Sequence, residues 1–125
     1  MRRRVLVVDD EPDIREIARL ALERLAGWTV LTASSGADAL AVAEQQKPEI
    51  ILLDVMMPGM DGPETARRLT ANAATSGIPI LMLTAKAMSA ETAQLAAGPV
   101  AGVLIKPFDP TRLASDIERL LGWSG

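Results

Sequence analysis

The sequence predicts an α/β protein in which five parallel strands form one sheet between two layers of helices. Short apolar or β-branched runs, typical of buried parallel strands, occur five times along the chain. Stretches with helical periodicity separate these runs, so that strand and helix alternate. Polar side chains follow four of the runs, and the carboxyl ends of parallel strands are where such sheets bind ligands.

The first strand is expected at residues 5–8, and a helix follows it. Proline is tolerated in a first helical turn, so Glu11-Pro12-Asp13 is a suitable start. Gly27 stands where a left-handed residue commonly ends a helix. The apolar residues of this helix recur at helical spacing and predict its core face: Ile14, Ile17, Ala18, Ala21, Leu22 and Leu25.

The second strand is expected at residues 29–33. Ser34 or Ser35 then caps a second helix that extends to about Gln46. The residues of this helix that face inward are predicted to be Ala39, Leu40 and Ala43. The third strand begins after Pro48 and leads to Asp54.

A turn of Pro-Gly-Met-Asp-Gly at residues 58–62 precedes a third helix at about residues 63–71. A loop of small residues leads into the fourth strand, residues 80–83. A fourth helix is expected at about residues 90–97, where the apolar stripe consists only of alanine and leucine.

The fifth strand, residues 102–105, leads to Lys106. Asp109 and Pro110 are a suitable cap and first-turn residue for the last helix. The core face of that helix is predicted to be Leu113, Ile117, Leu120 and Leu121. An alternating chain of this size favours the flavodoxin-like (βα)5 sandwich of three layers with the strand order 2-1-3-4-5, which makes strands one and three neighbours.

The composition of the chain excludes several kinds of site and binding partner. The chain has 125 residues, enough for one domain. That domain is expected to span residues 1–125, with the core of the fold at about 4–121. Cysteine and histidine are both absent, which excludes disulfides, thiolate or imidazole metal ligands and a phosphohistidine on this chain. The net charge is -3, and beyond Arg2-Arg3-Arg4, expected to be a solvated lead-in, no basic stripe indicates nucleic-acid binding. No segment is long enough to span a membrane, so a soluble cytoplasmic protein is expected.

The polar residues at the strand ends predict one site. If strands one and three are neighbours, Asp9, Asp10 and Asp54 crowd together and repel one another unless a cation neutralises them. Mg²⁺ suits this set because it takes one or two carboxylates and leaves positions for water and phosphate oxygens. With Lys106 and Thr84 added, the set fits phosphoryl transfer, in which the Asp54 carboxylate would be the nucleophile.

These residues lie in motifs that resemble the receiver domains of two-component response regulators, the class that includes the single-domain chemotaxis regulators. The resemblance covers about residues 4 to 121. Its motifs are Val-Val-Asp-Asp-Glu-Pro at 7–12, Leu-Leu-Asp-Val-Met-Met-Pro-Gly-Met-Asp-Gly at 52–62, Ile-Pro-Ile-Leu-Met-Leu-Thr-Ala at 78–85 and Lys-Pro-Phe at 106–108. Singly the acid pair or the Lys-Pro is weak, but all four in this order are specific.

The resemblance implies that Asp54 accepts a phosphoryl group from a histidine kinase or phosphotransfer protein, so that the chain is a switch and not a turnover enzyme. Asp10, Asp54 and the backbone carbonyl of Met56 would bind Mg²⁺, and Asp9 would act mainly through water. Lys106 would contact the phosphoryl group, and Thr84 would swing toward it. The bond before Pro107 would be cis.

The resemblance also implies a readout surface formed by the fourth helix, the fifth strand and the last helix. A downstream effector protein would bind there, or a second copy of the chain would bind there in a phosphorylation-dependent homodimer. The family usually has an aromatic residue at the position of Val103, so a loop shift without an aromatic swing is expected here. Two positions that help set the phosphoryl lifetime in the family are Met56 and Lys86. Since Met56 offers an attacking water no side-chain hydrogen bond, slow self-dephosphorylation is expected.

Two other functions remain open. A receiver-like adaptor that is never phosphorylated would usually lose part of the acid cluster or the lysine, and this chain keeps both. A phosphatase of the haloacid-dehalogenase type normally has a second aspartate two residues after the nucleophile, where this chain has Met56. Trp28 and Trp123 are interpreted as anchors at the ends of the domain, although Trp123 also suits a partner or oligomer contact.

Overall fold

Five parallel strands form a single sheet in the order β2-β1-β3-β4-β5, as the sequence predicts. The computed structural model describes residues 3–85 and 99–123. The strands are β1 (Arg4–Val8), β2 (Thr29–Ala33), β3 (Ile50–Asp54), β4 (Ile80–Thr84) and β5 (Gly102–Ile105). All five lie within one residue of their predicted positions.

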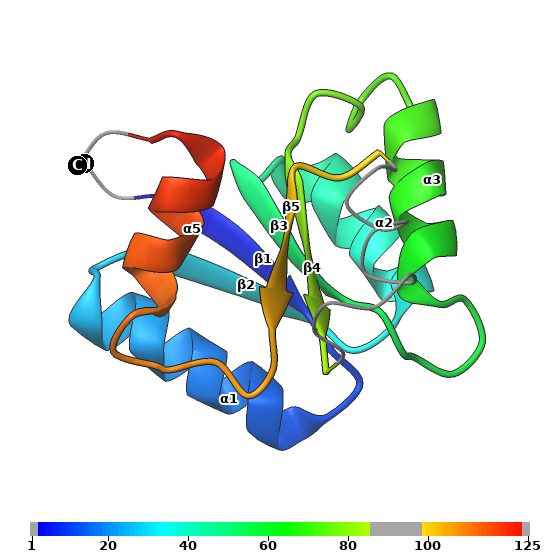
Figure 1. The fold of residues 1–125 in the computed structure, drawn as a ribbon. Coiled ribbons are helices and arrows are strands. Elements are labelled where there is room, and N and C mark those ends of the chain that lie inside the picture. Colours follow the sequence, from blue (N-terminus) through cyan, green and yellow to red (C-terminus); the bar gives the residue numbers. More distant parts are fainter. Residues whose placement is uncertain (1–2, 86–98, 124–125) are drawn as a thin grey trace.

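Helices cover both faces of the sheet, α1 and α5 on one face and α2 and α3 on the other (Figure 1). They are α1 (Pro12–Leu20), continued by a π-helical turn η1 (Ala21–Leu25), then α2 (Gly36–Gln46), α3 (Gly62–Ala71) and α5 (Leu113–Leu121). Among residues 3–85 and 99–123, no helix combines the length and the apolar character that a membrane crossing requires. The predicted fourth helix at 90–97 and Lys86 lie outside the described residues.

The alternation of side chains along the strands produces two separate hydrophobic cores. In β1, Val5 and Val7 pack under α1 and α5, whereas Leu6 and Val8 pack under α2 and α3. All four are fully buried, as both faces of a parallel sheet must be when helices cover them. The result is the predicted three-layer sandwich.

The predicted core face of the first helix is wrong at two residues. Ile17 is 43% exposed and Leu25 is 65% exposed, although Ala18, Ala21 and Leu22 are buried as expected. Leu25 ends the π-helical turn, whose wider repeat carries it away from the α-helical stripe. The helix then ends at Gly27, whose φ of 73° is the left-handed conformation that the sequence predicts there.

The predicted start of the last helix is also wrong. Helix α5 begins at Leu113, and its N-cap Arg112 makes no side-chain capping bond. Asp109 instead accepts hydrogen bonds from the backbone N–H and the hydroxyl of Thr111, at 2.9 and 2.7 Å. This local turn uses the carboxylate before the helix begins, so Asp109 and Pro110 belong to the preceding loop.

The two ends of the described chain pack on each other. The guanidinium of Arg3 lies 4.1 Å from the centre of the Trp123 ring, and Trp123 meets Trp28 edge to face at 6.1 Å. Trp28 is buried, which confirms its predicted role as an anchor. The expected solvated lead-in is therefore wrong for Arg3, which lies against Trp123, and for Arg4, which is part of β1 and half-buried.

Candidate functional site

The strand register brings the predicted site residues to one edge of the sheet. Val8 pairs with Leu53, Asp54 pairs with Leu83, and Thr84 pairs with Ile105. Asp9 and Lys106 each follow directly after a paired residue. Four segments far apart in the sequence thus end at the same level, at the carboxyl edge where parallel sheets bind ligands.

Lys106 lies between two carboxylates of this edge. Its Nζ atom donates to Asp9 Oδ2 at 2.9 Å and to Asp54 Oδ1 at 3.0 Å. Asp9 is fully buried and Asp54 is 4% exposed. Lys106 follows β5, so its side chain crosses β4 to reach the ends of β3 and β1, and one ammonium group balances part of a dense negative charge.

Burial and hydrogen bonds shift the pKa of both Asp54 and Lys106. Burial raises the pKa of the Asp54 carboxyl above its ordinary value, the hydrogen bond from Lys106 opposes this shift, and the charge of Asp9 adds to it. A hydrogen bond from the backbone N–H of Met56 also favours the charged carboxylate. Burial alone would lower the pKa of Lys106, but its hydrogen bonds to Asp9 and Asp54 outweigh burial and raise that pKa.

Three carboxylates are close enough to share a cation. One oxygen each from Asp9, Asp10 and Asp54 lies within 4.8 Å of the others. Lys106 contributes a single positive charge against these carboxylates. A set of hard oxygen ligands with surplus negative charge fits Mg²⁺, a cation that also binds phosphate oxygens.

Backbone contacts hold Asp9 in place. The backbone N–H of Glu11 donates to Asp9 Oδ1 at 2.9 Å, and the Arg15 guanidinium donates to the Asp9 carbonyl at 2.7 Å. The backbone N–H of Asp9 donates to the carbonyl of Ala33 at 3.2 Å. The sequence did not indicate the role of Arg15, because a single arginine on a helix is normally a solvated charge.

Gly62 is a second supporting residue that the sequence did not identify. A Cβ atom at this position would lie 2.4 Å from the Asp54 carbonyl oxygen and 2.8 Å from the Val55 Cα, both backbone atoms. The first residue of α3 therefore packs directly against the end of β3. The signal was present in the Pro-Gly-Met-Asp-Gly turn, which indicated only a turn and not this close approach.

The other predicted residues lie around this centre. Thr84 ends β4, is 8% exposed, and its carbonyl accepts the Lys106 backbone N–H at 2.7 Å. The bond between Lys106 and Pro107 is cis, as predicted. Met56 follows β3 in the next loop, and 78% of its surface is exposed. Val103 pairs with Met82 in β5 and packs against the core under α2 and α3.

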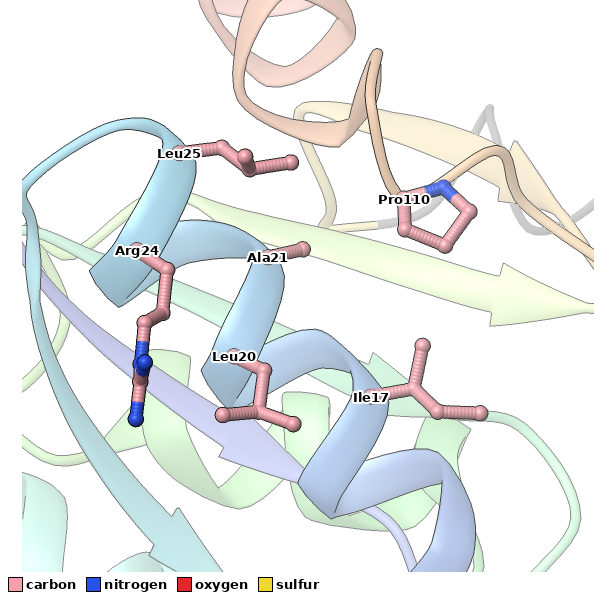
Figure 2. Close-up of a pocket in the computed structure, with 6 residues that line it drawn as sticks. All are labelled: Ile17, Leu20, Ala21, Arg24, Leu25 and Pro110. Atoms are coloured by element: carbon pink, nitrogen blue, oxygen red, sulfur yellow. The ribbon is translucent and has the colours of Figure 1, made fainter.

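An apolar groove lies on the α1 side of the molecule. Its volume is about 560 Å³, and its lining residues are Ile17, Leu20, Ala21, Arg24, Leu25 and Pro110. Figure 2 shows Ala21 and Leu25 pointing toward Pro110, whereas Arg24 extends away from it. Both walls of the groove come from segments that follow site residues, since α1 begins soon after Asp10 and Pro110 follows Lys106 by four positions.

The fold and the acid cluster define a class: a doubly wound α/β protein with a carboxylate-rich site at the carboxyl edge of its sheet. The family model of the response regulator receiver domain matches residues 5–118. The chain therefore belongs to the response regulator receiver domain family, as its motifs predicted. Receiver domains of this family are signalling switches and generally not turnover enzymes.

Known relatives agree with this assignment. The chain is 41% identical over 121 residues to the phosphate regulon transcriptional regulatory protein PhoB of Pseudomonas aeruginosa. The aligned region covers 97% of this chain and 52% of PhoB. It spans about half the length of PhoB and of the next two curated regulators that it matches. The chemotaxis protein CheY4 of Vibrio cholerae superposes with a TM-score of 0.86 at 37% identity, covering 97% of this chain and 100% of CheY4.

A further structural relative contains a metal ion. The receiver domain of a Pseudomonas aeruginosa sensor histidine kinase was solved with a magnesium ion coordinated in its active site cleft. It superposes with a TM-score of 0.84 at 30% identity, covering 98% of this chain and 99% of that domain. That relative and the carboxylate cluster of this chain are both consistent with Mg²⁺ binding here.

Proposed function

We propose that this chain is a phosphoacceptor switch of a two-component phosphorelay, in which Asp54 takes a phosphoryl group from a histidine kinase or phosphotransfer protein. The observation that carries the proposal is the position of Lys106, bonded to both Asp9 and Asp54 beside the third carboxylate, Asp10. A buried acid group that is surrounded by cation-binding oxygens and an ammonium group is suited to receive a phosphoryl group.

The transfer would use the residues of this edge in distinct roles. An oxygen of Asp54 attacks phosphorus, the new P–O bond forms as the P–N bond of the donor phosphohistidine breaks, and the imidazole leaves with the electron pair. Asp10, Asp54 and the Met56 carbonyl would hold Mg²⁺, and Asp9 would act through water. Mg²⁺ supplies positive charge that offsets the charge of the carboxylates and of the incoming phosphoryl oxygens. Lys106 donates to a phosphoryl oxygen.

Phosphorylation would then shift a pre-existing equilibrium between two conformations. Thr84 moves toward the phosphoryl group, and the β5 and α5 surface, with the segment before β5, becomes the readout for an effector protein or a second copy of the chain. Val103 is aliphatic and packs against the core, which supports a loop movement without an aromatic swing.

The apolar groove beside α1 supports docking of the phosphodonor protein. A donor that presents a phosphohistidine to Asp54 must cover the surface next to the site, and both walls of the groove continue from site segments. Exposed Ile17, Leu20 and Leu25 are costly to leave in water and suit the apolar face of a partner helix.

The hydrolysis of the phosphoryl group is expected to be slow. The Met56 side chain offers only a weakly accepting thioether to a water that attacks phosphorus. A phosphoryl half-life of seconds, measured by release of inorganic phosphate, would contradict this expectation.

Two other functions are compatible with the fold and make different predictions. An unphosphorylated adaptor would take up no phosphoryl group, although the retained acid cluster and lysine disfavour it. An aspartate-nucleophile phosphatase would release phosphate repeatedly from an aryl phosphate. Met56 stands where that class has its second aspartate, so this function ranks below the adaptor.

Intact-mass measurement after incubation with Mg²⁺ and acetyl phosphate tests the proposal, with Asp54→Asn as the control. One added phosphoryl group, absent in the control and without Mg²⁺, is the expected result. No addition under any condition would reject the switch and favour the adaptor.

A further inference from the structure

Met56 differs in accessibility from the other methionines that the structure describes. It is 78% exposed, whereas Met57 is 8% exposed and Met82 is 1% exposed. Met60 is half-buried, and its sulfur packs close to Gly36: a Cβ atom added to that glycine would lie 3.1 Å from the sulfur. Among the methionines that the structure describes, Met56 therefore presents its thioether most openly to a dissolved oxidant.

Met56 is also joined to the phosphoacceptor. It follows Asp54 by two residues, and its backbone N–H donates a hydrogen bond to the Asp54 carboxylate. Its backbone therefore contacts the Asp54 carboxylate, while most of the residue's surface faces solvent. A chemical change at this sulfur alters the polarity of an exposed side chain two residues from the phosphoacceptor and leaves the buried cores untouched.

We propose that Met56 is an oxidation site whose conversion to the sulfoxide shortens the lifetime of the phosphoryl group on Asp54. This inference rests on the proposed function, because it concerns the regulation of the same site. In the oxidation step, hydrogen peroxide transfers one oxygen atom to the Met56 sulfur. The S–O bond forms, the O–O bond breaks, and the second oxygen of the peroxide leaves as water. The sulfur loses two electrons and the peroxide gains them.

The sulfoxide changes how water is held at the site. A thioether sulfur is a weak acceptor, whereas a sulfoxide oxygen is a strong one on the same flexible side chain. A water that is hydrogen-bonded to this oxygen lies near the phosphorus and can attack it. The new P–O bond forms as the bond to Asp54 breaks, the carboxylate leaves with the electron pair, and the water proton passes to phosphate or solvent.

The test compares three proteins, each with and without a short exposure to hydrogen peroxide. They are the natural chain, Met56→Leu, which lacks an oxidisable sulfur at this position, and Met56→Gln, whose carboxamide oxygen imitates the sulfoxide acceptor. Peptide mass mapping measures oxygen addition at every methionine. Each sample is then labelled with acetyl phosphate and Mg²⁺, the donor is removed, and loss of the phosphoryl group is followed by intact mass.

We expect Met56 to be oxidised before Met57 and Met82, and the phosphoryl half-life of the natural chain to fall about fivefold, the factor that one ordinary hydrogen bond contributes to a rate. Peroxide should leave the half-life of Met56→Leu at its own untreated value, and Met56→Gln should lose its phosphoryl group faster than Met56→Leu. The Met56→Leu sample also carries every other methionine, so it removes their oxidation as an explanation.

Three results would overturn the inference while the switch itself stands: slower oxidation of Met56 than of the buried methionines, an unchanged half-life after complete oxidation at Met56, or an equal effect of peroxide on Met56→Leu. If the untreated natural chain takes up no phosphoryl group, the proposed function fails first. The two failures are distinguished by the untreated sample alone.

Discussion

At the scale of single residues, the raised pKa of Asp54 makes the stability of the metal-free protein depend on pH. Burial is the main cause of this raised pKa, which means that the folded state binds a proton at Asp54 more tightly than the unfolded chain does. Stability contributed by this group therefore increases as pH falls through the folded pKa toward the ordinary value of 3.8.

Asp54→Asn removes this titration. Without Mg²⁺, the free energy of unfolding of the natural chain relative to Asp54→Asn should rise as the pH is lowered from neutral toward 4, by the linkage relation. Urea unfolding at several pH values measures this difference. A difference that is constant with pH, or that falls on acidification, would show that the carboxyl is not destabilised by its surroundings.

Lys106 should matter for stability as well as for transfer. Lys106→Met leaves Asp9 and Asp54 buried without their ammonium partner, and breaking a buried ion pair from one side costs about 3 kcal/mol. We expect that loss in urea unfolding without Mg²⁺ and a partial recovery when Mg²⁺ is added, because the metal replaces the missing charge. Equal destabilisation with and without Mg²⁺ would argue against a metal site at these carboxylates.

Gly62 provides a test of the backbone under the phosphoacceptor. Gly62→Ala forces a methyl group against the Asp54 carbonyl, and overpacking of this kind costs about 2 kcal/mol. Phosphorylation of Asp54 should also slow, since the end of β3 must shift. Gly77→Ala is the matched control, because a Cβ atom there meets nothing within 4 Å. Similar stabilities of the two variants would exclude the close packing.

At the scale of elements, the sequence predicted strands more accurately than helix ends. Each strand is a short run bounded by turn residues, and burial on both faces leaves little freedom in where it begins. Helix ends depend on local competition: Asp109 bonds to Thr111 before it can cap α5, and the π-helical turn changes the repeat that would bury Leu25. Neither effect has a periodic signature in the sequence.

The exposed apolar residues of α1 give this helix a testable role in partner binding. Ile17→Glu places a charge in the groove, and we expect phosphotransfer from a histidine-phosphorylated donor protein to fall about tenfold, as for a central interface residue. Labelling by acetyl phosphate, which needs no docking surface, is the comparison rate. Ala41→Glu, an exposed position of α2 on the other side of the sheet, is the control variant. A loss in both variants, or in neither, would reject the groove as the docking surface.

At the scale of the whole molecule, the site could be predicted because topology alone assembles it. Asp9, Asp54, Thr84 and Lys106 each follow or end a strand, and parallel strands in this order must end at one edge. Contacts that do not follow from strand order could not be predicted. Arg15 reaches a backbone carbonyl and Gly62 makes room for one, and both depend on the exact separation of packed elements.

The contact between the chain ends is another such feature, and it ties α5 to the opposite edge of the sheet from the site. Trp123 follows the last helix and packs between Trp28 and the Arg3 guanidinium. Trp123→Ala should lower the free energy of unfolding by about 2 kcal/mol, less than for a fully buried tryptophan because Trp123 is only half-buried.

Arg3→Gln separates the contribution of the cation from that of the ring. It should cost about 0.5 kcal/mol and weaken with added salt, since Arg3 also pairs with Glu49 at 3.5 Å. Urea unfolding followed by tryptophan fluorescence measures both variants. Because Trp123 packs at the opposite edge of the sheet from Asp54, labelling by acetyl phosphate should proceed in folded Trp123→Ala, and a loss of labelling there would mean that the end contact also positions the site.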